Sequence, residues 1–495
     1  MTRALLLTML MLAPAAGAQI LPGPPLPALP AGLPGAFPGN LPAGPGLSSL
    51  ARHAADPLTH AVRRLEDARK LRIRLLLRRH ADLLEADPNG EPIVRGDVLA
   101  FSPTDAVLAR ARAAGFPVLR DSTLAALGMR IVTLGVPRGT STRRALRRLR
   151  RLDPGGIYDF NDIYTESGLP ERRTDERRSR AGNPVSPPGM ASGTTRTAAH
   201  ARGARSDGAV SLGLIDGGVG TTQAVFQDTA VHRYGCGGAA VPSAHGTEVA
   251  SLMVGRSAQF GGAAPGATLY AADVYCGKPT GGNVQAIARA LAWLASRRVA
   301  VINVSLVGPP NALLQQVVRR AVSRGFLLVA AVGNDGPAAP PLYPAAYPGV
   351  IGVTAVDARR RVLFEAERGP QVMFAAPGAD IVAATTPAGF ERVRGTSFAA
   401  PLVSGLLAAR LDRPSPAAAR EAVAALAQEA IHLGAPGRNP VFGYGLIGAS
   451  LPSPRPPDDE SNGKNSRLPG KNSALTVVVP FESRGWAAAS RGERP

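Results

Sequence analysis

An aspartate, a histidine and a serine stand in three short motifs that are typical of catalysis by an activated hydroxyl. Asp216 follows the apolar run 212–215, His245 begins the sequence His-Gly-Thr-Glu, and Ser397 lies in Gly-Thr-Ser-Phe-Ala-Ala-Pro. A serine hydroxyl becomes a strong nucleophile when an imidazole accepts its proton, and a buried carboxylate orients that imidazole. Each motif alone is common in turns and loops. Together the three predict a Ser-His-Asp arrangement.

Strands and helices that alternate along the second half of the chain are expected to position these side chains. Strands are predicted at Val210–Ile215, Leu269–Tyr275, Val299–Val304, Leu327–Ala331 and Val350–Val356, with helices at Val284–Arg297 and Leu313–Ser323. Such alternation predicts an α/β fold in which a parallel sheet carries helices on both faces. Ligands then bind at the carboxyl ends of the strands, where Asp216 is expected.

The order Asp216, His245, Ser397 and the residues around them resemble the subtilisin-like serine peptidases. The same order is not that of chymotrypsin-like or α/β-hydrolase enzymes. The resemblance covers roughly residues 206–450 and implies a subtilisin-like fold that hydrolyses peptide bonds in protein or peptide substrates. It makes Ser397 the nucleophile, His245 the general base and Asp216 its partner.

Two further segments fit the family and imply the rest of the site. Ala330–Gly336 resembles the oxyanion segment, which makes Asn334 a side-chain donor and places Gly333 against the substrate. A second segment resembles the one that pairs with the substrate backbone as an added strand; its residues are Ser305, Leu306, Val307 and Gly308. Asp335, which follows Asn334, would favour basic substrate side chains.

Three positions depart from the residues usual in the family. Gly217 stands where serine or threonine is usual, so a hydroxyl near the catalytic carboxylate is missing. Val307 replaces a glycine and should narrow the pocket beside the scissile bond, and Leu402 replaces a histidine that we expect to be structural. None of these changes removes a catalytic group. The resemblance also implies a cis peptide bond at Tyr343-Pro344.

Two other classes of protein remain open. A degenerate family member would bind peptides without cleaving them, if Gly217 and Val307 prevented productive binding. A dinucleotide-binding α/β domain would use the glycine-rich turn Gly217–Gly220 after a strand. That turn is not followed by G-x-G-x-x-G or by a suitably placed acidic residue.

The first 91 residues divide into three parts by composition. Residues 1–18 are typical of a secretory signal peptide, with Arg3, an apolar stretch and Ala16-Gly17-Ala18 as the cleavage site. Residues 19–50 form a Pro/Gly-rich linker. Residues 51–91 are basic, and Leu58–Glu85 is predicted as an amphipathic helix that packs on its own domain rather than on a membrane surface. We therefore expect a secreted or periplasmic protein with no transmembrane span after signal cleavage.

Residues 92–164 are predicted to form a small α+β domain. The expected elements are Val98–Phe101, Asp105–Ala114, Val118–Leu124, Met129–Val136, Ser141–Leu152 and Ile157–Tyr164. Their order, β-α-β-β-α-β, is the split ferredoxin-like unit. This pattern resembles the prodomain of the subtilisin-like family, which implies an intramolecular inhibitor whose last strand leads into the active-site cleft.

Two polar segments complete the organisation. Residues 165–205 are charged and Pro-rich and are expected to form an exposed connection that is cleaved during processing. Arg172-Arg173 and Arg177-Arg178 are candidate cleavage sites. Residues 451–495 are predicted to be a disordered tail.

Two cysteines are too few for a disulfide scaffold or a four-thiolate zinc site. In an exported protein, Cys236 and Cys276 are candidates for one disulfide. A zinc site of His232, Cys236 and His245 is disfavoured, because it would consume the predicted base and lacks a standard spacing. Family members often bind structural Ca²⁺, but no Asp-rich loop stands out, so we assign no metal ligand and expect no cofactor for the chemistry.

The formal charge of +20 comes from 56 basic and 36 acidic residues and is distributed unevenly. Residues 51–150 carry 20 basic and 10 acidic side chains, or half of the excess, whereas residues 206–450 carry 19 and 14. Because the catalytic segment is only weakly basic, no nucleic-acid partner is expected. Hydrophobic residues at 45% and charged residues at 19% exclude a wholly disordered chain and a coiled coil.

Overall fold

The computed structural model describes residues 64–166, 210–257, 260–387 and 389–451. The predicted signal peptide, the Pro/Gly-rich linker and nearly all of the processing segment and tail lie outside the described residues. The described part contains a small domain, residues 84–164, and a large domain, residues 210–451, joined by the contacts described below.

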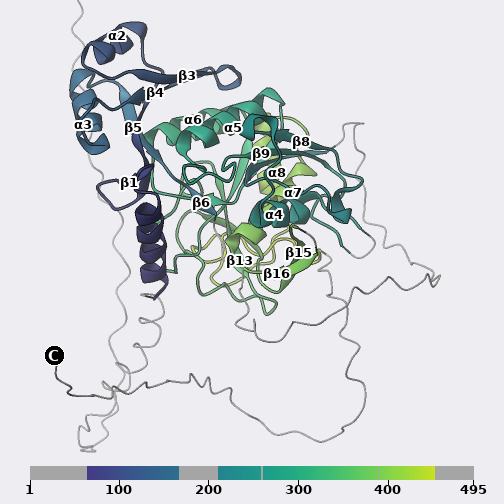
Figure 1. Cartoon of the computed structure of the whole chain (residues 1–495). Helices are drawn as coiled ribbons and strands as arrows, with labels where there is room; N and C mark the ends of the chain where they lie inside the picture. Colours follow the sequence, from purple (N-terminus) through teal and green to yellow (C-terminus); the bar gives the residue numbers. More distant parts are fainter. Residues whose placement is uncertain (1–63, 167–209, 258–259, 388, 452–495) are drawn as a thin grey trace, which may run out of the picture. The chain divides into compact units, whose positions relative to one another are not determined.

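A seven-stranded parallel sheet forms the centre of the large domain (Figure 1). In spatial order the strands are β14 (Val372–Pro377), β13 (Ile351–Val356), β12 (Leu327–Ala331), β10 (Val301–Val304), β7 (Ser211–Asp216), β9 (Thr268–Asp273) and β8 (Val231–Tyr234). Each neighbouring pair is parallel. The parallel sheet predicted from the alternating pattern is therefore confirmed, although β8 and β14 were not predicted.

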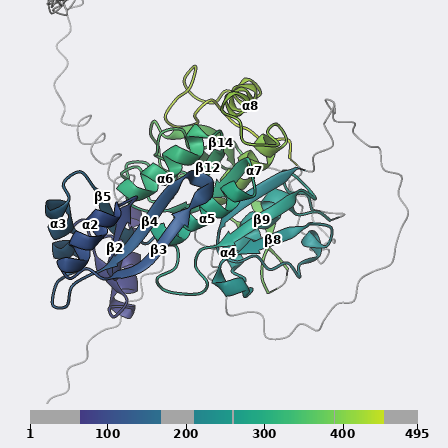
Figure 2. The ribbon, with the colours of Figure 1, turned by 90° about the horizontal axis from the view of Figure 1, so that it is seen from above.

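Helices cover both faces of this sheet, as predicted (Figure 2). One face packs against α4 (Ala244–Val254) and α7 (Thr396–Ala408), and the other against α5 (Val284–Ser296) and α6 (Ala312–Ser323). The two faces follow from the two-residue period of a strand. In β12, Val329 and Ala331 join the first core and Leu328 and Ala330 join the second. The hairpin β15 (Ile381–Ala384) and β16 (Phe390–Val393), with α8 (Pro416–Gln428), completes the domain.

The small domain is an antiparallel sheet with two helices on one face. Its elements are β1 (Leu84–Ala86), β2 (Pro92–Phe101), α2 (Asp105–Ala113), β3 (Val118–Leu124), β4 (Met129–Gly135), α3 (Thr142–Leu152) and β5 (Ile157–Asp162). From β2 onward the order is β-α-β-β-α-β, and the strands pair as β3-β4-β2-β5. Val98 packs towards α2 and α3, whereas its neighbour Leu99 packs towards the helices of the large domain.

The helix predicted at Leu58–Glu85 ends earlier than expected, and a strand that was not predicted follows it. Helical structure covers residues 64–79, not the predicted stretch up to Glu85. Leu84–Ala86 forms β1 instead, because Leu84 is buried and pairs with Val94 of β2. A strand of three residues is too short to show the two-residue period that distinguishes it from a helix end.

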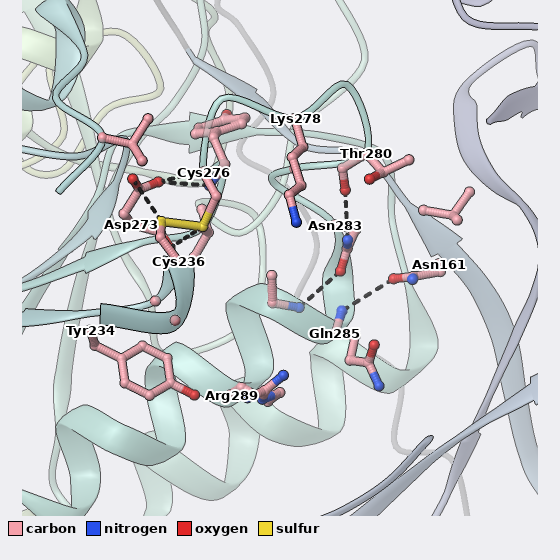
Figure 3. A pocket seen from close by; sticks show the side chains of 18 of the residues that line it. Asn161, Tyr234, Cys236, Asp273, Cys276, Lys278, Thr280, Asn283, Gln285 and Arg289 are labelled. Carbon is pink, nitrogen blue, oxygen red and sulfur yellow. Dashed lines mark hydrogen bonds between the residues drawn. A yellow bond between two sulfur atoms is a disulfide. The ribbon is translucent and has the colours of Figure 1, made fainter. Parts of the chain in front are cut away.

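Polar contacts join the small domain to the start of α5 and α6. Gln285 Nε2 donates to Thr133 Oγ1 at 2.6 Å. Figure 3 shows the second bond, in which Gln285 N donates to Asn161 Oδ1 at 3.2 Å. Asn311 caps α6 and also donates to Asp162 Oδ2 at 2.7 Å. A cavity of about 850 Å³ remains beside these contacts. Apolar contacts accompany them, since Leu99, Leu127 and Ile131 of the small domain are buried in one cluster with residues of α5 and α6.

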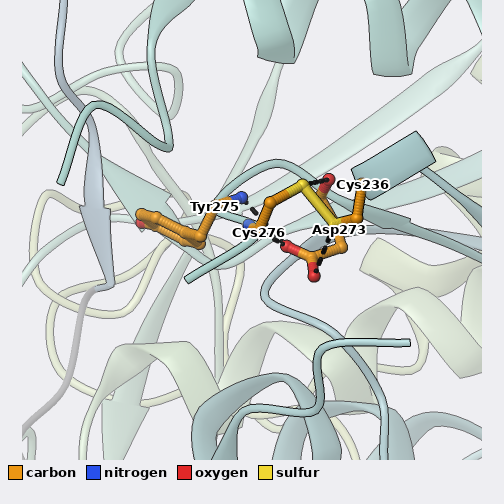
Figure 4. The surroundings of a disulfide bond; sticks show 4 residues. All are labelled: Cys236, Asp273, Tyr275 and Cys276. Carbon is orange, nitrogen blue, oxygen red and sulfur yellow. Dashed lines mark hydrogen bonds between the residues drawn. A yellow bond between two sulfur atoms is a disulfide. The ribbon is translucent and has the colours of Figure 1, made fainter. Parts of the chain in front are cut away.

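A disulfide between Cys236 and Cys276 ties the turn after β8 to the turn after β9 (Figure 4). Asp273 Oδ1 accepts hydrogen bonds from Tyr275 N and Cys276 N, both at 2.9 Å, and so holds the second turn. The two cysteines are 40 residues apart, and α4 lies between them in the sequence.

Among the described helices, none is long and apolar enough to cross a membrane.

We expect removal of this disulfide to lower the free energy of unfolding by about 2–4 kcal/mol, because the bond restricts a 40-residue loop in the unfolded chain. The measurement is urea unfolding of Cys236→Ala/Cys276→Ala in a Ser397→Ala background, which removes the predicted nucleophile. Reductant should shift the parent by a similar amount and leave the double variant unchanged. Equal stability of parent and double variant would contradict this account.

Candidate active site

Asp216 is the last residue of β7, at the carboxyl edge of the sheet, and is completely buried. Its Oδ1 accepts a hydrogen bond from Gly217 N at 2.7 Å and lies 2.9 Å from His245 Nδ1. Its Oδ2 has no hydrogen-bond partner within the described part of the chain. The Asp216 carboxylate is thus directed at the His245 imidazole. Its second oxygen receives no hydroxyl hydrogen bond from residue 217, because Gly217 has no side chain.

His245 lies in the first turn of α4, where Ser243 accepts from Gly246 N at 3.0 Å and caps the helix. Its ring packs against Phe398, the residue after Ser397, with ring centroids 5.5 Å apart. Because Nδ1 is engaged by Asp216, Nε2 is the atom available for a serine proton. Within the described residues this Nε2 has no hydrogen-bond partner.

Ser397 is the second residue of α7, after Gly395, whose φ of 136° favours glycine. Its Oγ donates to Ser305 O at 3.3 Å, and its own carbonyl accepts from Ser305 Oγ at 2.9 Å. The second bond has a simple cause. Pro401 has no N–H, so the carbonyl four residues earlier lacks its helical partner, and the Ser305 hydroxyl replaces it.

Asn334 and Gly333 are joined to the start of the same helix. Asn334 Oδ1 accepts from Thr396 N at 3.0 Å, and Gly333 N donates to Thr396 Oγ1 at 3.2 Å. An amide whose oxygen is held in this way has its Nδ2 as the donor group. The Asn334 side chain therefore lies next to the N-terminal end of α7, where the helix dipole favours negative charge.

Residues 164–166 extend from the small domain into the large domain. Tyr164 N donates to Gly282 O at 2.9 Å, and its buried hydroxyl donates to Pro309 O at 2.6 Å. The two-residue strand β6 (Thr165–Glu166) pairs antiparallel with β11 (Leu306–Val307). The predicted strand Ile157–Tyr164 therefore ends in the small sheet at Asp162, and the chain continues as an added strand on the large domain.

Glu166 brings a second carboxylate to the Asp216–His245 pair, since ligand atoms of all three residues lie within 4.8 Å of one another. Burial alone would lower the pKa of His245, but Asp216, Glu166 and Glu248 raise it to about 9. Burial raises the pKa of Glu166, and the nearby charge of Asp216 raises it further, whereas His245 lowers it. The imidazole is therefore protonated at neutral pH while Glu166 is in place.

The structure shows the surroundings of the three departures from the family pattern. A Cβ on Gly217 would lie 2.2 Å from Ser243 Oγ, so the capping serine occupies the space that a side chain at 217 needs. Val307 is 8% exposed and lies opposite Thr165. Leu402 is buried in the core around α7, in keeping with a structural role. The Tyr343-Pro344 peptide bond is cis.

The structure does not bring the residues of the zinc alternative together as ligands. Cys236 is bonded to Cys276, His232 stacks on Tyr270 with centroids 4.6 Å apart, and His245 is bound to Asp216. Sulfur in a disulfide is not the thiolate that zinc requires. Sequence reasoning missed Ser243 and Glu166; an N-cap pattern before His245 was the signal available for the first.

A parallel α/β sheet whose carboxyl edge carries an Asp-His pair and a helix-start serine defines the class of the subtilisin-like proteins. A profile described as the subtilase family matches residues 207–445. Subtilisin Savinase of Lederbergia lenta is 35% identical over 223 residues, which cover 43% of this chain and 79% of that protein. The chain belongs to the subtilase family.

Other relatives extend this comparison. The minor extracellular protease Epr of Bacillus subtilis (strain 168) is 32% identical over 206 residues, which are 41% of this chain but only 32% of that protein. The crystal structure of fervidolysin from Fervidobacterium pennivorans, described as a keratinolytic enzyme related to subtilisin, has a TM-score of 0.57 at 19% identity. It covers 75% of this chain and 62% of the other, and it concerns the fold alone. Family membership removes the dinucleotide-binding alternative.

We expect the His245 imidazole to titrate with a pKa of about 9 in the full-length Ser397→Ala chain, and Glu166→Gln to lower this pKa, because one neighbouring negative charge is lost. Since the raised pKa reflects stabilisation of the protonated ring, that stabilisation is present below about pH 6.5 and is lost as the pH rises through 9. Imidazole NMR measures the titration. Glu66→Gln, on the helix at residues 64–79, is the control, and a pKa near 6.5 in both proteins would overturn the assignment.

Proposed function

We propose that this chain is a secreted serine endopeptidase made as a precursor. The observation that carries the proposal is the 2.9 Å contact between Asp216 Oδ1 and His245 Nδ1, beside the helix start that holds Ser397. The family assignment supports the reaction class, since the matched region contains all three residues. Epr is named as an extracellular protease, which agrees with the signal peptide expected at residues 1–18.

In the proposed mechanism, Ser397 Oγ attacks the peptide carbonyl while His245 Nε2 accepts its proton. Asp216 holds Nδ1, fixes the tautomer and stabilises the imidazolium. The oxyanion receives hydrogen bonds from Asn334 Nδ2 and Ser397 N–H at the positive end of α7; one such donor is worth about 10²–10³ in rate. His245 then returns the proton to the leaving amine, and water hydrolyses the acyl-enzyme by the reverse sequence. These steps need no cofactor.

The small domain is proposed to be the intramolecular inhibitor. Its exit strand lies on Leu306–Val307, where a substrate backbone would be added as a strand. Glu166 lies beside the catalytic pair and adds to the effect of Asp216, which together with Glu248 raises the pKa of His245 to about 9, and a protonated imidazole accepts no proton from Ser397. Processing then has two effects, since removal of residues 164–166 empties the groove and lowers the pKa of the base.

We expect Ser397→Ala to abolish both labelling by a phosphonylating serine reagent and hydrolysis of casein by the processed protein, with kcat falling about 10⁶-fold. Ser404→Ala is the matched control, because Ser404 is another buried serine of the same helix and should leave labelling intact. Absence of labelling and of casein hydrolysis in the processed wild type would favour the degenerate peptide-binding alternative instead.

The register of β6 predicts where the precursor is cut. Val307 pairs with Thr165 and Leu306 with Glu166, so residue 167 comes opposite Ser305 if the pairing continues by one residue. The carbonyl of Ser305 is the acceptor for Ser397 Oγ. We therefore expect cleavage of Ser167-Gly168, within the predicted segment 165–205 but before its arginine pairs, and N-terminal sequencing of the mature protein should begin at Gly168.

The control for this experiment is the Ser397→Ala precursor, which should keep its full length. We also expect the first cleavage to be unchanged in a variant that carries glutamine instead of arginine at positions 172, 173, 177 and 178. A mature chain that begins directly after Arg173 or Arg178, and is lost in that variant, would contradict the register.

A further inference from the structure

The helix at residues 64–79, the dark purple helix of Figure 1, forms one wall of a cavity beside the catalytic residues. The cavity measures about 760 Å³. The helix contributes Leu65, Ala68, Arg69, Arg72, Ile73 and Leu76, which share one face at the three- and four-residue spacing of a helix. The opposite wall includes Glu166, Val307, Asn334 and Asp335. This helix precedes the small domain, so it is an addition to the inhibitor described above.

All three guanidinium nitrogens of Arg69 contact carboxylates, and these contacts join the helix to both domains. Its Nε lies 2.7 Å from Asp335 Oδ2 in the large domain. Its Nη1 and Nη2 lie 2.6 and 2.8 Å from the two carboxylate oxygens of Glu91, next to β2. Arg72 approaches the other oxygen of Asp335 at 3.6 Å. The planar fork of arginine suits this double recognition, which a lysine does not reproduce.

Asp335 is one of the acidic residues of this wall, beside Glu166 and Glu365, and Glu365 is paired with Arg394. Asp335 itself is 7% exposed, and burial raises its pKa, whereas Arg69 and Arg72 lower it. Glu367 lies behind Gly333 with one buried oxygen that has no partner in the described residues, but burial and the charge of Asp335 raise its pKa to about 9, so it is neutral at pH 7. Within the described part of the chain, Arg69 and Arg72 are the cations within 4.0 Å of Asp335.

The position of Asp335 says which part of a substrate it meets. It follows Asn334, whose amide receives the oxyanion in the proposed mechanism, and it shares the cavity with Val307 on the strand that pairs with the substrate. The side chain nearest to it is therefore that of the residue whose carbonyl is attacked. A carboxylate held in a partly buried wall attracts a cation more strongly than one exposed to water.

We propose that Asp335 makes this cleft select a positively charged side chain at the residue before the scissile bond, and that Arg69 fills the same subsite in the precursor. The proposal rests on the peptidase function proposed above. The helix at residues 64–79 is then a second inhibitory element, which blocks the side-chain subsite while residues 164–166 block the backbone groove.

The selectivity is tested on the processed enzyme with matched peptides that differ only in Arg, Lys, Gln or Leu before the scissile bond. We expect the wild type to prefer Arg or Lys over Gln in kcat/KM, and Asp335→Asn to reduce this ratio of kcat/KM values at least tenfold. Glu421→Gln, an exposed acid on α8, makes the same charge change and should leave the preference intact. A preference that is absent, or equal in wild type and Asp335→Asn, overturns the proposal.

The occupancy by Arg69 is tested on the full-length Ser397→Ala precursor with p-aminobenzamidine, an aromatic cation whose fluorescence rises on binding. We expect Arg69→Gln/Arg72→Gln to increase its affinity at least tenfold, and the further change Asp335→Asn to remove the gain. Arg74→Gln/Arg78→Gln is the matched control, because both arginines are exposed on the same helix and neither lines the cavity. Equal affinity in all these precursors overturns the occupancy of the subsite by Arg69.

These outcomes are separable from failure of the proposed function. A processed wild type that cleaves none of the peptides and is not labelled at Ser397 contradicts the peptidase itself. One that is labelled and cleaves neutral and cationic peptides equally contradicts only the role of Asp335. The Asp335→Asn measurement is made after processing, so it holds even where a change in the helix impairs folding of the precursor.

Discussion

The buried hydrogen bond between Asp216 and His245 is the constraint on which the active-site arrangement depends. A carboxylate with no exposed surface is costly unless it is paired, so the end of β7 and the start of α4 must meet within hydrogen-bond distance. The parallel sheet makes this meeting possible, because it collects the carboxyl ends of its strands at one edge. Gly217 belongs to the same constraint, since the cap of α4 leaves no room for its side chain.

A second set of contacts fixes Ser397, the proposed nucleophile, relative to that pair. The proline in α7 removes a helical hydrogen bond at the carbonyl of Ser397, and Ser305 from the substrate-binding segment supplies the replacement. Ser397, the segment around Asn334 and the segment that begins at Ser305 are therefore held by one polar network at the start of α7. Interlocking of this kind keeps reacting groups in place without relying on loop rigidity.

Two segments of the first half of the chain cover this site in the structure. An extended segment from the small domain pairs with the substrate strand, and a basic helix covers the neighbouring cavity, so two different parts of the first half of the chain meet one cleft. The uneven charge now has a structural meaning. The excess of basic residues at 51–150 includes Arg69 and Arg72, which face an acidic residue of the large domain. The net charge of the whole chain would suggest a nucleic-acid partner, but these two arginines form ion pairs within the chain.

The sequence by itself determined the reaction class and the architecture. Strand and helix periods repeat over many residues, so the architecture can be predicted from the sequence. The motifs around Asp216, His245 and Ser397 are specific in combination, so the reaction class can be predicted as well. The short strands β1 and β6 could not be predicted, because three and two residues are too few to show the two-residue period of a strand. Only the tertiary structure decided that Glu166 reaches the catalytic pair, that Ser243 excludes a side chain at Gly217, and that Arg69 meets Asp335, 266 positions further along. These contacts depend on how separate elements pack, and a single sequence does not encode that packing locally.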